Sequence, residues 1–386
     1  MTELPEPTLA ARAHSERVVD AIHSEIAARG GYLPFSRYME LALYAPGLGY
    51  YAAGAKKLGP AGDFVTAPEM TPLFATALAT QVSAILAATG RREIVELGGG
   101  SGRLAADLLP ALAAQDALPS RYAILEPSPD LAERQRATIA RDAAAHLDRV
   151  AWIDRLPETI DGALIANEVL DAIPVDVIAR RNGQWQERGV TWDDARNAFA
   201  WAERPADTRR VALAEARFPP VGDYLSEINP AAEALVEDIA RRLSGGAALF
   251  IDYGFPAAEY YHPQRNEGTL MCHYRHRVHD DPFAWPGLTD VTAHVDFTAM
   301  AEAGERTGLH VAGFAALAPF LMGCGILDAL AATGPPESKT YIVAAAAVQK
   351  LLAPSEMGEL FKVLALTRLD AIEWPGFTLA DRRHRL

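Results

Sequence analysis

The chain has 386 residues, half of them hydrophobic and 22% charged, and its formal net charge is −14 at pH 7. This length predicts two to three structural units, and the composition excludes a disordered chain and a polytopic membrane protein. The acidic balance repels phosphate backbones, so we expect no nucleic-acid partner. The longest uncharged stretch, 311–327, is interrupted by Pro319, Gly323 and Gly325, which argues against an integral membrane segment.

Cysteine content and the N-terminus indicate the compartment. The only two cysteines, Cys272 and Cys324, form neither a disulfide framework nor a C-x-x-C pair, which favours a reducing environment. The first seven residues lack both the basic region and the apolar run of a secretory signal. We therefore expect a cytoplasmic protein.

The first 90 residues combine helices with an aromatic loop region. Apolar residues at helical spacing predict helices over 14–28 and 72–89. Between them, 44–51 and 62–69 are rich in glycine, proline and tyrosine or phenylalanine. This composition indicates either an ordered functional loop or a packed connector.

From residue 93 onward, short β-type strings alternate with helical patterns, which is typical of a parallel α/β sheet. The expected strands are 93–97, 122–126, 150–153, 162–167, 247–253, 309–317 and 340–348. The expected helices are 104–112, 129–145 and 230–243. The stretch 175–226 interrupts this alternation, and its Asn182-Gly183 pair is a hairpin-turn signal. We interpret it as a small antiparallel insert.

The most informative motif follows the first expected strand and precedes a helix. It reads Glu-Leu-Gly-Gly-Gly-Ser-Gly over 96–102. A dinucleotide-binding loop needs glycine where Arg103 stands, and a Walker loop needs Gly-Lys-Ser/Thr, so neither fits. Glycines allow close approach of a ligand to the backbone, and N–H groups at a helix start can receive a carboxylate. The candidate cofactor-binding residues here are Glu96, Gly98, Gly99, Gly100 and Gly102.

This loop suits a nucleoside cofactor without a pyrophosphate, and S-adenosyl-L-methionine is such a cofactor. An acidic residue should then close the next strand, because one carboxylate accepts hydrogen bonds from both ribose hydroxyls. Glu126 occupies that position. Asp154, after the third strand, is either a contact to the adenine edge or an ordinary loop acid.

Polar residues also follow the fourth strand, at the edge where open parallel sheets bind ligands. They are Asn167, Glu168 and Asp171. If a helical turn begins at Glu168, Glu168 and Asp171 share one face, and two adjacent carboxylates suit a cationic methyl acceptor. The alternative is that Asp171 or Asn167 caps the following turn.

Histidines gather later in the chain. Three of them, spaced three apart, lie within 273–279 together with two arginines. Such spacing serves metal sites on helices, but the arginines would repel a cation, so we expect no metal site. His294 is available for proton transfer, although its stretch also suits a helix cap.

Seven strings in chain order resemble one family. They are 62–69 (Gly-Asp-Phe-Val-Thr-Ala-Pro-Glu), 96–102, 126–129 (Glu-Pro-Ser-Pro), 167–174 (Asn-Glu-Val-Leu-Asp-Ala-Ile-Pro), 251–254, 292–297 and 357–364. The chain resembles the class I S-adenosylmethionine-dependent methyltransferases of the mitochondrial complex I assembly-factor type, which include the mitochondrial dysfunction protein A group. Such proteins often have Gly-Pro-Gly where this chain has three glycines, which predicts a more flexible loop.

The resemblance implies a seven-stranded, Rossmann-like α/β methyltransferase sheet with S-adenosyl-L-methionine as cofactor. It adds Asp63 and Thr66, on the first string, to the cofactor-binding residues. In the eukaryotic branch it implies symmetric dimethylation of an arginine in the 49-kDa-type core subunit of respiratory complex I. The expected parts are 1–90 (helical and loop segment capping the donor site), 91–174 (first part of the core), 175–226 (insert), 227–348 (second part of the core) and 349–386 (C-terminal segment).

The expected reaction is in-line transfer of a methyl group to a guanidinium nitrogen. Glu168 and Asp171 would orient the guanidinium, and His294 or a carboxylate would accept the proton. Two alternatives stay open. One is a methyltransferase for a small molecule or a glutamine amide, which Asn167 would recognise. The other is a non-catalytic assembly factor that keeps the methyltransferase fold.

Overall fold

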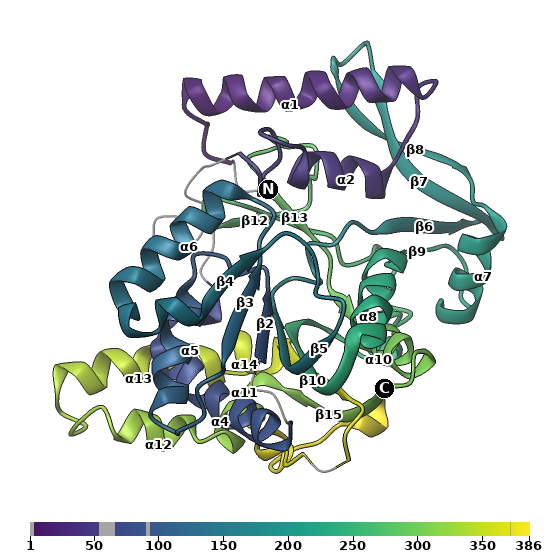
Figure 1. Ribbon diagram of the computed structural model, residues 1–386. Helices are drawn as coiled ribbons and strands as arrows, with labels where there is room; N and C mark the ends of the chain where they lie inside the picture. The colour runs from purple at the N-terminus through teal and green to yellow at the C-terminus, as the bar shows by residue number, and fades with distance from the viewer. Residues whose placement is uncertain (1–3, 54–65, 90–92, 371) are drawn as a thin grey trace. The chain divides into compact units, whose positions relative to one another are not determined.

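The computed structural model describes residues 4–53, 66–89, 93–370 and 372–386. The chain forms two units, each assembled from three separate stretches. Unit 1 consists of Met1–Phe64, Asp171–Glu233 and Pro256–Asp296. Unit 2 consists of Val65–Leu170, Ala234–Phe255 and Phe297–Leu386. Figure 1 shows the elements of both units along the chain.

Unit 2 is built on a mixed sheet whose strands lie in the order β15, β16, β10, β5, β2, β3 and β4. The neighbours from β10 to β4 pair in parallel, whereas β16 is antiparallel to both β10 and β15. The strands are β2 (Glu93–Leu97), β3 (Arg121–Leu125), β4 (Val150–Ile153), β5 (Ile160–Asn167), β10 (Leu243–Phe255), β15 (His310–Ala316) and β16 (Phe361–Thr367).

Helices cover this sheet on both faces, and Figure 1 shows α5 and α10 on opposite sides of it. Those of unit 2 are α3 (Ala67–Met70), α4 (Pro72–Ala88), α5 (Arg103–Ala113), α6 (Pro129–Asp142), α10 (Phe297–Arg306), α11 (Leu317–Gly323), α12 (Ile326–Ala331), α13 (Lys339–Leu352) and α14 (Met357–Leu360). Three short 3₁₀ turns are η1 (Ala144–Arg149), η2 (Pro375–Phe377) and η3 (Arg383–Arg385).

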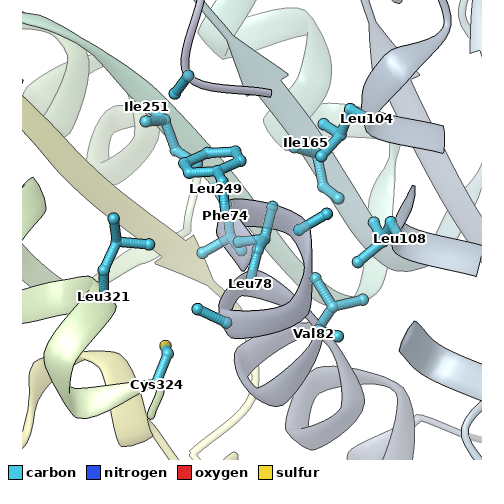
Figure 2. Packing of buried hydrophobic residues seen from close by; sticks show 14 of the residues in the cluster. Phe74, Leu78, Val82, Leu104, Leu108, Ile165, Leu249, Ile251, Leu321 and Cys324 are labelled. Atoms are coloured by element: carbon cyan, nitrogen blue, oxygen red, sulfur yellow. The ribbon is translucent and has the colours of Figure 1, made fainter. Parts of the chain in front are cut away.

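The core of unit 2 lies between α4 and the sheet. Figure 2 shows Phe74 and Leu78 of α4 directed toward Leu249 and Ile251 of β10. On the other face, Phe297 at the start of α10 packs against Phe314, with ring centroids 5.4 Å apart. Side chains of a strand alternate between faces, so a sheet covered on both faces needs nearly continuous apolar strands. This requirement explains the apolar runs 163–166 in β5 and 247–251 in β10.

One expected strand is wrong. Residues 340–348 belong to helix α13, and the sheet strand late in the chain is β16. The local sequence explains the error, because β-branched and aromatic residues at 340–343 are followed by four alanines, the strongest helix formers. Ser338 begins the helix, and its Oγ accepts a hydrogen bond from the Tyr341 backbone N–H at 3.2 Å.

Unit 1 contains two helices before a small antiparallel sheet in the order β1, β7, β6 and β9, with β8 paired to β7. The elements are α1 (Leu9–Ala28), β1 (Leu33–Pro34), α2 (Phe35–Tyr44), β6 (Asp176–Arg181), β7 (Gln184–Asp193), β8 (Ala198–Pro205), α7 (Thr208–Arg217) and β9 (Tyr224–Ile228). Helix α8 (Pro230–Arg242) begins in unit 1 and ends in unit 2. The predicted antiparallel insert is confirmed.

The hairpin between β6 and β7 has the turn that the sequence predicts. Asn182 and Gly183 both have positive φ, 48° and 77°. Such a two-residue turn matches the twist of the flanking strands. A second small sheet of unit 1 has the order β12, β11, β13. The remaining elements of this unit are α9 (Ala257–Tyr260), β11 (Met271–Tyr274), β12 (Arg277–His279), β13 (Asp290–Thr292) and β14 (Val295–Asp296).

The packing of α4 gives a stability prediction. Leu78 is fully buried whereas Leu379 is 61% exposed, so the two leucines form a matched pair. Leu78→Ala should lower the free energy of unfolding by about 2–5 kcal/mol, because the removed atoms leave a cavity that the sheet cannot fill. Leu379→Ala should change it by less than about 0.5 kcal/mol. Urea denaturation measures both, and equal effects would contradict this account of the core.

Candidate active site

The register of the parallel strands brings the candidate residues of unit 2 to one edge. Leu97 lies opposite Leu125 on one side and Ala166 on the other. The residues that follow these three positions are therefore level at the carboxyl end of the sheet, which is where open parallel sheets bind ligands. They are Gly98, Glu126 and Asn167.

The loop after β2 turns sharply into α5. Gly98, Gly100 and Gly102 have φ values of 63°, 53° and 82°, which glycine adopts at little cost. Gly102 is also crowded, since a Cβ there would lie 2.8 Å from the Cα of Gln135. The loop thus presents backbone groups at the start of α5 without intervening side chains, which is the arrangement that ligand-binding loops need.

Helix α3 holds this loop from outside. The Ser101 hydroxyl donates to Oε1 of Glu69, and Thr66 stands at the N-cap of α3. Sequence reasoning did not select Glu69, although it closes the string 62–69. Asp63 lies outside the described residues.

Glu126 follows β3 directly, and two donors fix its carboxylate. Oε1 accepts from the Ser128 backbone N–H and Oε2 accepts from Nε2 of Gln135, both at 2.9 Å. Burial raises the pKa of Glu126, and these two hydrogen bonds oppose that rise. A carboxylate offers about four acceptor positions, so it has further capacity to accept hydrogen bonds.

Glu96 points into the protein. It is 3% exposed, and its Oε2 accepts from the Tyr122 hydroxyl at 2.8 Å. Burial raises its pKa to about 7, with a smaller rise from Glu126, against the effect of the Tyr122 bond. Asp154, in contrast, points into solvent. Its side chain is 85% exposed, and its Oδ1 lies 3.8 Å from Nε of Arg155.

A residue with a strained backbone conformation, Glu168, follows the end of β5. Glu168 has φ of +53°, a conformation that costs a non-glycine residue of order 1–3 kcal/mol. Its Oε1 accepts hydrogen bonds from Nδ2 of Asn167 at 3.2 Å and from the Ala67 backbone N–H at 3.3 Å. A positive φ excludes a right-handed helical turn beginning here, so that expectation is wrong. Strain of this kind persists where the surroundings impose it.

Asp252 imposes the turn. Its side chain is 1% exposed, and Oδ2 accepts from the backbone N–H groups of Val169 at 3.2 Å and Leu170 at 2.9 Å. The Glu168 N–H donates to the Ile251 carbonyl at 2.9 Å. Sequence reasoning did not find this role, because only the tertiary pairing of β10 with β5 creates it.

Asp171 and His294 both belong to unit 1. The Asp171 carbonyl accepts from the Ala293 N–H at 3.0 Å, which joins the two chain segments. Asp171 is 6% exposed. The His294 N–H donates to the Thr269 hydroxyl at 3.2 Å, and its Nδ1 lies 3.4 Å from the Thr269 carbonyl.

The histidines within 273–279 lie on the β11–β12 hairpin and its turn, not on a helix. Within the described ranges, no three His, Cys, Asp or Glu side chains are grouped so as to hold a metal ion. In the same part of the chain, no helix has both the length and the apolar character needed to cross a bilayer.

The comparisons with known proteins agree with this geometry. Residues 76–315 match the model of a family described as S-adenosyl-L-methionine-dependent methyltransferases. The match covers more than half of the chain, which therefore belongs to this family. The predicted α/β methyltransferase fold, the reaction class and the cofactor S-adenosyl-L-methionine are confirmed.

A solved structure supports the cofactor directly. A protein from Burkholderia thailandensis, crystallised with S-adenosyl-homocysteine bound, is 48% identical, with a TM-score of 0.95 and coverage of 100% of both chains. A native crystal structure from the same organism, also 48% identical, gives a TM-score of 0.93 over the same coverage. The chain is an S-adenosyl-L-methionine-dependent methyltransferase.

Curated relatives carry more specific names. The Drosophila melanogaster protein named protein arginine methyltransferase NDUFAF7 homolog, mitochondrial, is 29% identical over 94% of this chain and 88% of its own length. The Mus musculus protein arginine methyltransferase NDUFAF7, mitochondrial, is 29% identical over 87% of this chain and 81% of its own length.

These names overturn the predicted cytoplasmic location, which is wrong because the relatives are named as mitochondrial proteins. The error has a physical reason. A lack of disulfide bonds indicates a reducing compartment but does not say which one.

The buried Glu96 predicts a pH dependence of stability. The folded protein keeps the Glu96 proton up to about pH 7, whereas the unfolded chain releases it near 4.5. The unfolded state is thus increasingly favoured as pH rises between these values, and this group lowers the free energy of unfolding by up to about 3 kcal/mol. Glu96→Gln should remove that loss, so urea denaturation should show a shallower fall from pH 5 to 7 than in the wild type.

The exposed Glu337 provides the control for this experiment, because Glu337→Gln removes the same charge at the surface. It should keep the wild-type pH slope. If Glu96→Gln also keeps that slope, the assignment of the slope to Glu96 is wrong.

Asp252 gives a prediction about the turn at Glu168. Asp252→Ala should lower the free energy of unfolding by about 2–5 kcal/mol, since it leaves the buried N–H of Leu170 and the half-buried N–H of Val169 without this acceptor. Asp252→Asn keeps an acceptor oxygen and should cost less than half of that amount. Urea denaturation measures both variants. Two losses below about 0.5 kcal/mol would show that Asp252 does not hold the turn.

Proposed function

We propose that this methyltransferase modifies an arginine side chain of a protein substrate. The names of the Drosophila and mouse relatives support an arginine acceptor. The observation in this chain that carries the proposal is the Glu168 carboxylate on a strained backbone position, whose Oε1 accepts from Asn167 and Ala67 at the carboxyl edge of the sheet.

For the cofactor, we assign the loop 98–102 and Glu126. The crowding at Gly102 supports a loop whose backbone faces a ligand. The further acceptor capacity of Glu126 suits two ribose hydroxyls. Asp154, Asp63 and Thr66 stay proposed cofactor contacts. Glu96 is buried, and we propose that it stabilises the site through its hydrogen bond with Tyr122 rather than by contacting the cofactor.

The chemistry of the acceptor explains the need for a carboxylate. S-adenosyl-L-methionine supplies an electrophilic methyl group, and its sulfonium becomes a thioether when the methyl carbon bonds to the acceptor nitrogen. A guanidinium stays protonated at neutral pH, and its nitrogen lone pairs are delocalised, so it is a poor nucleophile. A carboxylate held at Glu168 binds it through charge-assisted hydrogen bonds and localises the positive charge away from the attacking nitrogen.

We assign two supporting roles within unit 1. Asp171 is proposed as a second carboxylate for the acceptor, and His294 as the group that takes the proton released from the guanidinium nitrogen. The bond between the Asp171 carbonyl and the Ala293 N–H supports treating these two segments together.

The proposed substrate is the 49-kDa-type core subunit of respiratory complex I. This finer assignment rests on the family resemblance carried by the strings 62–69, 96–102 and 167–174. The net charge of −14 supports a cationic acceptor region. An arginine-bearing segment of the subunit would be attracted electrostatically to this acidic enzyme.

The proposed function predicts a specific loss in one variant. Glu168→Gln should lower transfer of radiolabelled methyl groups to the purified subunit by roughly 10²-fold or more, because the guanidinium loses its charged partner. Binding of S-adenosyl-homocysteine, measured by calorimetry, should stay unchanged. Glu337→Gln at the surface is the matched control and should keep full activity.

Mass spectrometry of the labelled subunit identifies the acceptor. Dimethylated arginine in a single peptide, lost when that arginine is replaced by lysine, is the expected result. Label in a glutamine amide, or in a small molecule of the lysate, would overturn the arginine assignment. Wild-type transfer by Glu168→Gln would overturn the role of Glu168.

A further inference from the structure

Gln135 of α6 is a fully buried polar side chain that none of the proposed roles uses. Its Nε2 donates to the Gly100 carbonyl at 3.1 Å and to Oε2 of Glu126 at 2.9 Å. Its Oε1 accepts from Nε1 of Trp152 at 2.9 Å. One amide group therefore joins the glycine loop, the end of β3 and strand β4.

The partners leave Gln135 only one orientation. The Trp152 indole only donates, so Oε1 must face it. The Gly100 carbonyl and Oε2 of Glu126 both accept from Nε2, so both of its hydrogens are used. Neither glutamate nor methionine reproduces this pattern, because an ionised glutamate has no hydrogen to donate and methionine has no strong polar group.

The glycine loop lies close against Gln135. A Cβ at Gly99 would lie 3.3 Å from Nε2 of Gln135, and one at Gly102 would lie 2.8 Å from its Cα. The glycines therefore let the loop lie directly against α6. The next residue of that helix, Arg136, places its guanidinium carbon 4.0 Å from the centre of the Trp152 ring, so consecutive residues of α6 hold the indole.

We propose that Gln135 is a positioning residue of the cofactor site, which acts by orienting the Glu126 carboxylate. This inference rests on the proposed contact between Glu126 and the ribose. Glu126 has two fixed hydrogen bonds, one from its own chain neighbour Ser128 and one from Gln135. Only the bond from Gln135 comes from a separate element, so it determines where Oε2 points.

The hydrogen bond from Gln135 also affects the pKa of Glu126. Burial raises the pKa of Glu126, and the Gln135 bond counteracts this rise. An ionised carboxylate is a stronger acceptor for hydroxyl groups than a neutral one. Gln135 therefore supplies the orientation that ribose binding needs and favours the charged form of Glu126.

A double-mutant cycle on S-adenosyl-homocysteine binding, measured by calorimetry, tests the proposal. Glu126→Ala and Gln135→Met should each weaken binding by at least about tenfold. The double variant should bind within about threefold of Glu126→Ala, because Gln135 acts through Glu126. If the double variant instead loses the product of the two single-variant factors in affinity, the positioning role is wrong. If Glu126→Ala alone binds as the wild type does, the proposed ribose contact fails instead.

The variant Gln135→Glu adds a pH test. At about pH 8 the new carboxylate repels Glu126 and should weaken binding by at least about tenfold. Protonation at about pH 6 restores one donor, so the ratio of variant to wild-type affinity should rise toward one. Gln349→Glu, on the exposed face of α13, is the control and should show no change. A ratio for Gln135→Glu that stays constant with pH would contradict the proposal.

A ligand-free measurement separates positioning from misfolding. The Trp152 indole N–H resonance, assigned by its loss in Trp152→Phe, should shift in Gln135→Met while the other indole resonances stay in place. An unshifted Trp152 resonance would contradict the network. Movement of all indole resonances would show a general structural change and remove the support from the binding data.

Discussion

The parallel pairing of β2 with β3 and β5 is the constraint on which the site depends. Because Leu97, Leu125 and Ala166 are paired in register on parallel strands, the residues that follow them lie at the same edge of the sheet. The same edge continues to β10, where Ile251 lies opposite Asn167. The glycine loop, the acid after β3 and the turn after β5 are thus neighbours although about 70 residues separate the first from the last.

At this edge several polar groups are hydrogen-bonded by a partner from another element. Glu96 is bonded by Tyr122, Glu126 by Gln135, and the N–H groups of Val169 and Leu170 by Asp252. Buried polar groups are costly unless they are hydrogen-bonded, and a fully satisfied network holds its members in one arrangement. Such rigidity is what a methyl transfer reaction requires, since its catalysis depends chiefly on alignment.

The parts of the fold and of the site that were predictable from sequence are those with a local signal. The glycine spacing after β2, the acid after β3 and the Asn182-Gly183 turn each depend on a few consecutive residues. Gln135 has no such signal, because only contacts with Gly100 and Trp152 distinguish it from any other helical glutamine. The positive φ of Glu168 was hidden for the same reason, since Asp252 imposes it from β10. The misplaced strand at 340–348 shows propensity outweighed by helix capping and an alanine run.

The position of β16 in the sheet bears on how the chain folds. This strand lies between β15 and β10, yet it begins only at Phe361. During synthesis, β10 is complete more than 100 residues before its antiparallel neighbour exists. Until then one edge of β10 has unpaired backbone groups, which are prone to pair with other chains. The polypeptide therefore has an interval of exposure while it is being made, and a chaperone that covers β10 would act in that interval.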